Sequence, residues 1–298
     1  MDRDRLHDRI RRLLFASPAL AKAFASGDYR SVFRGRGIEF DSLRDYGTDD
    51  DARLLDWSAT ARLGKPFVRT YREDRSLTVF LLIDASASMD QGSGELSKLE
   101  MAVLSSSLAA YAAQFRGLPV GCLVFARTVL RKLSPRRGKA HALAVAEAAL
   151  AEAVVATAAV ADDRVGSDLA LALRTAQAAL KRRSLVLVVS DFRARDWSVA
   201  LAELARKHDV VAVRISDRSD TELPPRGAFP VIDPESEQTA WLPLGSRAFA
   251  RRWAERGREL REMTLAACAE ARVSVLEIDT ADDPARRLLE FFEKRSVS

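Results

Sequence analysis

The chain contains only two cysteines, Cys122 and Cys268, in 298 residues. A single disulfide could not stabilise a chain of this length in the way that several disulfides stabilise small secreted domains. Both cysteines lie within apolar runs, so we predict buried, reduced thiols. Cysteine usage of this kind favours the cytoplasm as the compartment.

Long apolar segments are absent as well. The run Leu77–Ile83 is far shorter than the ~20 residues of a membrane-spanning helix, and the low-polarity stretch Ala140–Ala161 is interrupted by His141, Glu147 and Glu152. The N-terminus alternates acidic and basic residues and lacks the apolar segment of a signal peptide. We therefore expect a cytoplasmic protein with no membrane span.

The sequence also lacks a strong excess of one charge. It has 47 Lys and Arg residues against 42 Asp and Glu residues, a net charge of +5, and the two signs are interleaved along the chain. Nucleic-acid-binding proteins concentrate basic residues on one surface, so we do not expect nucleic-acid binding. Hydrophobic residues make up 48% of the chain, which is typical of a globular protein with a sizeable core.

From Leu77 onward, apolar runs of strand length alternate with helical segments of ten or more residues. The runs lie at 77–83, 119–125, 184–191, 209–215 and 273–279. The helical segments lie at 98–115, 140–157, 168–182, 198–207 and 246–271. This alternation predicts a three-layer, Rossmann-like α/β fold, a mainly parallel sheet with helices on both faces. A polar-tipped hairpin is predicted as an insertion near 229–244.

Residues 1–75 differ in character from the rest of the chain. Residues 1–27 are helical and amphipathic, whereas residues 28–75 are rich in Gly, Asp, Arg and aromatics and have no helical period. A short segment of mixed charge buries little apolar area. We therefore divide the chain into 1–75 and 76–298, and expect the irregular and β-structured part of 1–75 to pack on the α/β domain rather than to stand alone.

Carboxylates and hydroxyls follow the predicted strands where ligands bind in such sheets, at the carboxyl ends. Asp84, Ser86 and Ser88 form a D-x-S-x-S pattern after the first strand, Ser167 precedes a helix, and Asp191 ends the strand that begins at Ser184. Oxygen ligands without His or Cys suit Mg²⁺ or Mn²⁺ rather than Zn²⁺. Such side chains also serve simply as helix caps, but their recurrence at successive strand ends favours a metal site.

Catalytic motifs are missing. The sequence has no G-x-x-x-x-G-K-[ST], no G-x-S-x-G and no H-E-x-x-H. A haloacid-dehalogenase-type phosphotransferase needs a second Asp where Ser86 stands. We therefore predict an interaction module rather than an enzyme, and we keep a divalent-metal-dependent hydrolase or phosphotransferase using Asp84 and Asp191 as the alternative.

Three segments resemble the loops of a von Willebrand factor A domain: "LLIDASASM", "GSDLALAL" and "VVSDF". In that family these loops form the metal-ion-dependent adhesion site. The resemblance implies that one Mg²⁺ or Mn²⁺ is held by Asp84, Ser86, Ser88, Ser167 and Asp191. The family usually has Thr where this chain has Ser167, a change that keeps the hydroxyl.

A longer segment, "GRGIEFDSLRDYGTDDDARLLDWSATAR" (Gly35–Arg62), resembles the signature of the "domain of unknown function 58" family, as do "VIDPESEQ" and "LLEFFEKR". This resemblance implies a bacterial protein, often encoded beside MoxR-type AAA+ ATPases. It implies an adaptor or co-chaperone-like partner of such an ATPase, bound through a carboxylate that completes the metal site. For the signature we consider three roles: internal packing by Phe40, Tyr46 and Trp57, a docking surface for a partner, or a catalytic site.

Overall fold

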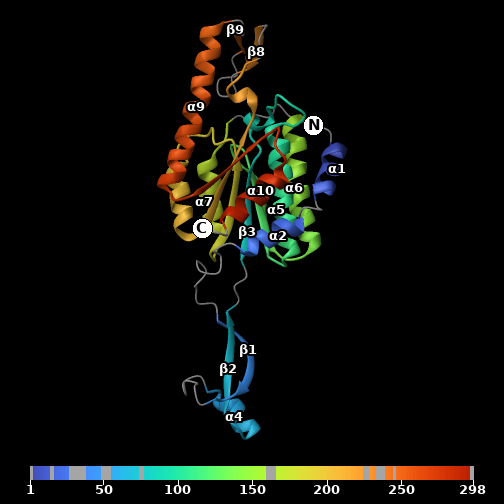
Figure 1. Ribbon diagram of the computed structural model, residues 1–298, viewed down its shortest axis with the longest axis vertical. Coiled ribbons are helices and arrows are strands. Elements are labelled where there is room, and N and C mark those ends of the chain that lie inside the picture. The colour runs from blue at the N-terminus through green and yellow to red at the C-terminus, as the bar shows by residue number, and fades with distance from the viewer. Residues whose placement is uncertain are drawn as a thin grey trace. The chain divides into compact units, whose positions relative to one another are not determined.

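The structure of the chain is a computed structural model (Figure 1). It describes residues 3–13, 17–26, 38–47, 55–73, 77–158, 166–223, 228–232, 239–243 and 246–295. The chain divides into two compact units. The α/β unit comprises Met1–Asp28 and Leu77–Ser298, and the small unit comprises Tyr29–Ser76.

The α/β unit is built on a six-stranded sheet with the strand order β10-β7-β6-β3-β4-β5. Five strands are parallel to their neighbours, and only the edge strand β5 runs antiparallel to the strand beside it. The strands are β3 (Thr78–Asp84), β4 (Val120–Phe125), β5 (Val129–Arg136), β6 (Ser184–Ser190), β7 (Asp209–Ser216) and β10 (Ser274–Asp279). The apolar runs therefore form strands covered on both faces, as predicted for a parallel sheet.

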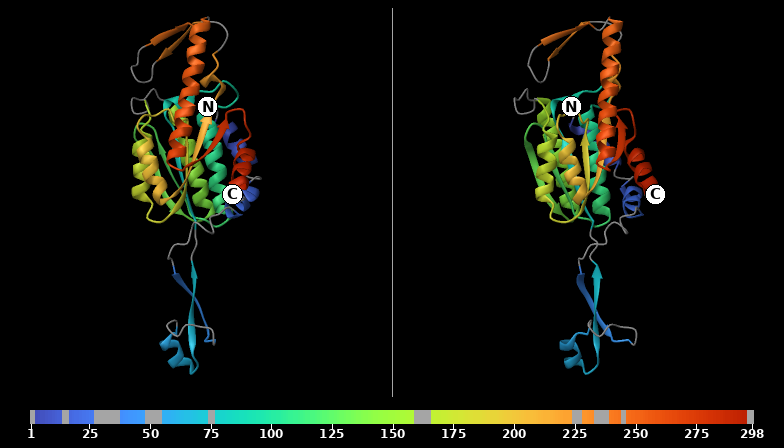
Figure 2. Two further views of the ribbon diagram at one scale, coloured as in Figure 1. Left: turned by 60° about the vertical axis from the view of Figure 1, so that its left-hand side comes forward. Right: turned by 90° about the vertical axis from the view of Figure 1, so that its left-hand side faces the viewer.

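Helices cover both faces of this sheet, which confirms the three-layer α/β prediction (Figure 2). One face carries α7 (Leu169–Ala179), α8 (Ser198–Lys207) and α9 (Arg247–Glu270). The other carries α5 (Lys98–Phe115), α6 (Lys139–Ala158) and α10 (Pro284–Arg295).

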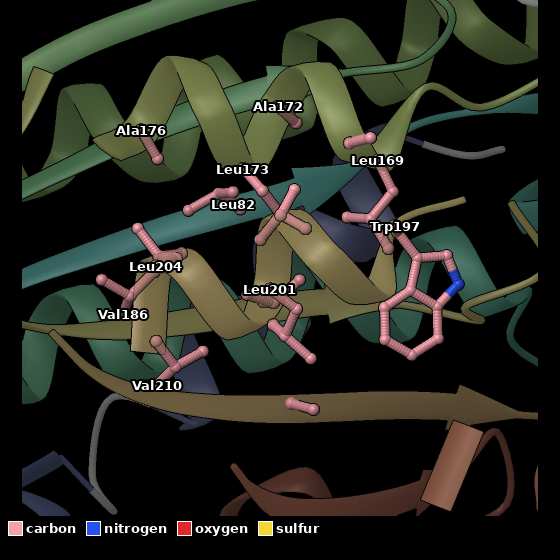
Figure 3. Close-up of a cluster of buried hydrophobic side chains, with 14 of the residues drawn as sticks. Leu82, Leu169, Ala172, Leu173, Ala176, Val186, Trp197, Leu201, Leu204 and Val210 are labelled. Atoms are coloured by element: carbon pink, nitrogen blue, oxygen red, sulfur yellow. The ribbon is translucent and has the colours of Figure 1, made fainter. Parts of the chain in front are cut away.

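Apolar side chains of α7 and α8 pack against the central strands and form one half of the core (Figure 3). Leu173 and Leu201 are fully buried between the helices and the sheet, near Val186 of β6. Trp197 precedes α8 and contacts Phe192 edge-on, with ring centroids 5.2 Å apart. This packing holds the loops after β3 and β6 at one edge of the sheet.

The N-terminal helices cluster with the α/β unit and not with residues 29–76, which differs from the predicted grouping of residues 1–75. Residues 3–26 form two helices, α1 (Arg3–Leu13) and α2 (Ser17–Ser26), and both pack on α5. Their apolar faces bury Leu6 and Leu20. The outer face of α5 is itself apolar, so it needs a cover, and α1 and α2 provide it.

The small unit contains a hairpin and one short helix. Strand β1 (Ile38–Asp45) pairs antiparallel with β2 (Phe67–Glu73), and α4 spans Trp57–Leu63. Asp56 caps α4, and Gly64 ends it in the left-handed conformation at φ 70°. These elements form a compact unit of their own. That this segment packs on the α/β domain stays a prediction.

Two further expectations concern the small unit and the inserted hairpin. Trp57 is 72% exposed, so the packing role predicted for it is wrong. Parts of the signature segment, residues 35–37 and 48–54, lie outside the described residues. The inserted hairpin is present as β8 (Ala228–Ile232) and β9 (Thr239–Pro243), and its tip also lies outside them.

The composition-based expectations can also be compared with the structure. Cys122 and Cys268 are both buried and free, as predicted. Burial raises the pKa of Cys122 to about 12 and that of Cys268 to about 11, so both thiols are unreactive near neutral pH. Within the described ranges, no helix combines the length and apolar character that crossing a membrane requires.

Candidate metal-binding site

The first predicted loop brings its three oxygen-bearing side chains together. Asp84 is the last residue of β3 and is fully buried. Its Oδ1 accepts a hydrogen bond from the backbone N–H of Ser86 at 2.9 Å, which turns the chain sharply after the strand. The Oγ atoms of Ser86 and Ser88 lie 3.3 Å apart. The D-x-S-x-S spacing therefore directs a carboxylate and two hydroxyls toward one place.

The second predicted loop, which precedes α7, also contacts the Asp84 carboxylate. The backbone N–H of Asp168 donates to the carbonyl of Ala126 at 2.9 Å, which ties this loop to the end of β4. Ser167 Oγ then donates to Asp84 Oδ2 at 3.1 Å. Asp168 itself caps α7 by accepting from Leu171 N–H at 2.7 Å, so the hydroxyl and not the neighbouring carboxylate joins the cluster.

The last residue of β6, Ser190, adds a hydroxyl that sequence reasoning missed. Ser190 Oγ donates to Asp84 Oδ2 at 2.7 Å and accepts from the N–H of Phe192 at 3.0 Å. Phe192 is buried and adopts φ 56°, an uncommon conformation for an aromatic residue that such sites impose locally. The signal was present in "VVSDF", where Ser190 directly precedes the predicted ligand Asp191.

The environment of Asp84 favours a bound cation. Burial, and then the charge of Asp191, raises the pKa of Asp84 to about 6, although hydrogen bonds from Ser86 and Ser190 lower it. The elevated pKa means that the ionised carboxylate is costly in this setting. A cation placed beside it would stabilise the ionised form.

Asp191 lies close enough to affect Asp84 but is held by two cations of the chain. Its Oδ2 accepts from Lys98 Nζ at 2.9 Å and lies 3.6 Å from Arg193 Nε. Both cations also contact Asp220, Lys98 at 3.3 Å and Arg193 at 2.8 Å. Burial alone would raise the pKa of Asp191, but Lys98 and Arg193 outweigh it and hold the pKa below its usual value.

Neither Lys98 nor Asp220 was singled out from the sequence. Lys98 is the first residue of α5, and a lysine at the start of a helix usually lies in solvent. Here its side chain is completely buried. No sequence pattern indicates this, because its partners follow it by 93 and 122 residues.

The residues present fit a hard divalent cation. Within the described ranges no group of three or more His, Cys, Asp and Glu side chains is placed to hold a metal ion. Asp84 and the hydroxyls around it supply oxygen donors only, which suits Mg²⁺ or Mn²⁺. The structure brings together the five residues predicted from the sequence, with Asp191 already ion-paired.

The chain is an α/β protein with an oxygen-lined cluster at the carboxyl edge of its sheet. Residues 42–263 match the family described as protein of unknown function DUF58, and the chain belongs to that family. The resemblance drawn from the Gly35–Arg62 segment is thereby confirmed.

Curated relatives occur in mycobacteria. An uncharacterized protein of Mycobacterium tuberculosis is 29% identical over 211 residues, which cover 70% of this chain and 65% of the relative. A protein of Mycobacterium bovis matches to the same extent. The chain therefore spans 65% of the length of these relatives.

Solved structures with lower identity are similar in part. The conserved hypothetical protein BatB of Bacteroides thetaiotaomicron is 15% identical, with 74% of this chain and 100% of that chain covered and a TM-score of 0.46. The VWA domain of SpRpn10 is 12% identical, with 72% and 94% covered and a TM-score of 0.37.

Proposed function

We propose that the chain is a divalent-metal-dependent protein-interaction module that serves as an adaptor or co-chaperone-like partner of a MoxR-type AAA+ ATPase. The observation that supports this most directly is that three serine hydroxyls lie at or beside the Asp84 carboxylate. Ser167 bonds to the Asp84 carboxylate, and the hydroxyls of Ser86 and Ser88 lie within 3.3 Å of each other beside it.

The donor set explains why a partner would bind through a carboxylate. Asp84 offsets part of the charge of Mg²⁺ or Mn²⁺, Asp191 is already paired with Lys98 and Arg193, and the serine hydroxyls add no charge. Mg²⁺ retains water readily, and an incoming Asp or Glu of the partner can replace one water and gain a direct ionic contact in a partly dehydrated site. The N-terminus of α7, next to Ser167, adds positive potential toward that carboxylate.

The choice of partner and compartment has separate support. The signature segment places the chain in a family whose members are often encoded beside MoxR-type ATPases, and this association motivates the proposed partner. The two buried, unpaired cysteines support the cytoplasm as the proposed compartment, because that compartment keeps thiols reduced.

The experiment compares binding of a purified MoxR-type ATPase to the full chain in Mg²⁺ and in EDTA, by calorimetry. We expect EDTA to weaken binding by at least about tenfold, and Asp84→Ala to do the same while the protein stays folded by circular dichroism. Asp168→Asn is the matched control, because Asn caps a helix as well as Asp does and residue 168 does not bond to Asp84. Equal affinity in Mg²⁺ and in EDTA would contradict a metal-bridged contact.

The alternative function, a metal-dependent hydrolase or phosphotransferase, requires Asp191 as its second carboxylate. Lys98 and Arg193 already pair with Asp191 and lower its pKa, which makes it a weak base. No specific observation favours this function over the interaction module. Metal-dependent phosphoester hydrolysis that is lost in Asp84→Asn would identify it.

A further inference from the structure

The geometry points to Lys98 and Arg193 as built-in counter-ions that compete with the divalent metal for Asp191 and thereby set the metal affinity of the site. This inference rests on the proposed function, because it concerns the same metal. It assigns a role to two cations, buried Lys98 and partly exposed Arg193, that the predicted five-residue site does not include.

Lys98 is buried against two carboxylates, Asp191 and Asp220. It opens α5 directly after the capping residue Ser97, and its side chain has no solvent exposure. An ammonium without a carboxylate partner in such a position would cost several kcal/mol. The Lys98–Asp191 contact of 2.9 Å is therefore a buried ion pair and not a solvent-screened surface pair.

Arg193 contacts the same two carboxylate oxygens as Lys98, Asp191 Oδ2 and Asp220 Oδ1. It is only two residues from Asp191, its side chain is 27% exposed, and it contacts both Asp191 and Asp220. Asp220, delivered by the turn after β7, completes the arrangement by accepting from both cations. The cluster is therefore an alternating network of two cations and two carboxylates.

The charges of this network determine which carboxylates at this edge of the sheet are not already paired with a cation of the chain. Asp191 and Asp220 are balanced by Lys98 and Arg193, so Asp84 is the carboxylate left without a cation of the network in contact. A divalent ion that uses Asp191 must share it with an ammonium at close range, and the like charges repel. The metal therefore binds weakly until a partner carboxylate adds further negative charge, and partner and metal strengthen each other by the same factor.

A purely structural role for Lys98 makes a different prediction. If Lys98 only stabilises the fold, removing it destabilises the protein and leaves metal affinity unchanged or weaker. If it competes with the metal, removing it destabilises the metal-free protein but tightens metal binding, so that added metal restores more stability than in the wild type. The two effects have opposite signs and can be measured separately.

The experiment titrates the metal-free full chain with Mn²⁺ alone, by calorimetry, and measures the thermal midpoint with and without Mn²⁺. We expect Lys98→Met to bind Mn²⁺ at least about tenfold more tightly than the wild type, a change of ~1.4 kcal/mol. Arg193→Gln should bind several-fold more tightly, because Arg193 is more exposed and better screened. The matched control is Arg218→Gln, which removes a 75% exposed cation on the turn that carries Asp220 and should leave affinity within about twofold.

The outcomes separate this inference from the proposed function. Wild-type protein that binds Mn²⁺, with variants of equal or lower affinity, overturns the role of Lys98 and Arg193 and leaves the metal site standing. Absence of Mn²⁺ binding in the wild type and in all variants overturns both. If Lys98→Met does not fold, Arg193→Gln decides the question, because it removes the partly exposed cation and leaves Lys98 paired.

Discussion

Asp217 joins three loops at the edge of the sheet that carries the candidate site, and its replacement by Asn should destabilise the protein strongly. Its carboxylate accepts hydrogen bonds from Ser93 N–H and Oγ, from Ser219 N–H and Oγ, and from Thr280 Oγ1. Ser93 precedes α5, Ser219 follows β7, and Thr280 follows β10. A single carboxylate therefore connects segments that are far apart in sequence.

The size of the effect follows from the burial of each partner. A hydrogen bond to a charged group contributes ~1.5–3 kcal/mol. Ser93 is exposed and would bond to water instead, whereas Thr280 is buried and Ser219 is half-buried. Counting mainly these last two partners, Asp217→Asn should lower the free energy of unfolding at pH 7 by about 2–4 kcal/mol.

The loss should also depend on pH. Burial alone would raise the pKa of Asp217, but the bonds from Ser219, Thr280 and Ser93 outweigh it and hold the pKa well below the usual value. A carboxylate with a depressed folded-state pKa contributes stability above its unfolded-state pKa of 3.8, and this contribution falls away at lower pH. The difference between wild type and variant should therefore be largest at pH 6–7 and shrink toward pH 3.

Urea denaturation of both proteins across this pH range is the assay. Asp283→Asn is the control, because Asp283 is exposed and caps α10 through Ala285 N–H, a task that Asn performs equally well. It should change stability by less than ~0.5 kcal/mol. A similarly small effect of Asp217→Asn at pH 7, or a large one that does not vary with pH, would refute the reasoning.

Two further predictions concern packing and protonation. Gly257→Ala in α9 should destabilise the protein by about 1–3 kcal/mol despite the better helix propensity of Ala, because the added Cβ would lie 2.3 Å from the Asp220 carbonyl oxygen. Gly94→Ala is the control, since Gly94 has open space around it. Equal or higher stability of Gly257→Ala in urea denaturation would contradict this prediction. His208 is buried, its ring nitrogens have no hydrogen-bond partner among the described residues, and burial, Lys207 and Arg183 lower its pKa. A base with a lowered folded-state pKa loses stability as the pH falls below its unfolded-state value of 6.5. His208→Leu should therefore lose less stability than wild type between pH 7.5 and 5, and equal losses in the two proteins would reject this role.

The local pattern of the sequence by itself determined most of the α/β unit. Helix α5 begins and ends where predicted, at Lys98 and Phe115, because a Ser97–Glu100 capping box opens it and Gly117 follows it. The buried strands were recognisable as continuous apolar runs, since both faces of a parallel sheet are covered. The grouping of Asp84, Ser86, Ser88, Ser167 and Asp191 was also predictable, because the carboxyl ends of parallel strands share one edge.

Only the tertiary structure decided which charges meet at that edge. Lys98 and Asp191 are 93 residues apart, and a lysine that is buried has the same sequence signature as one in solvent. The packing of α1 and α2 on α5 also depended on the fold. An amphipathic pattern indicates that a helix will bury one face, but it does not identify the element against which that face packs. Periodicity and capping act between near neighbours and can be read along the chain, whereas an ion pair and a helix-packing partner depend on contacts that exist only once the sheet has formed.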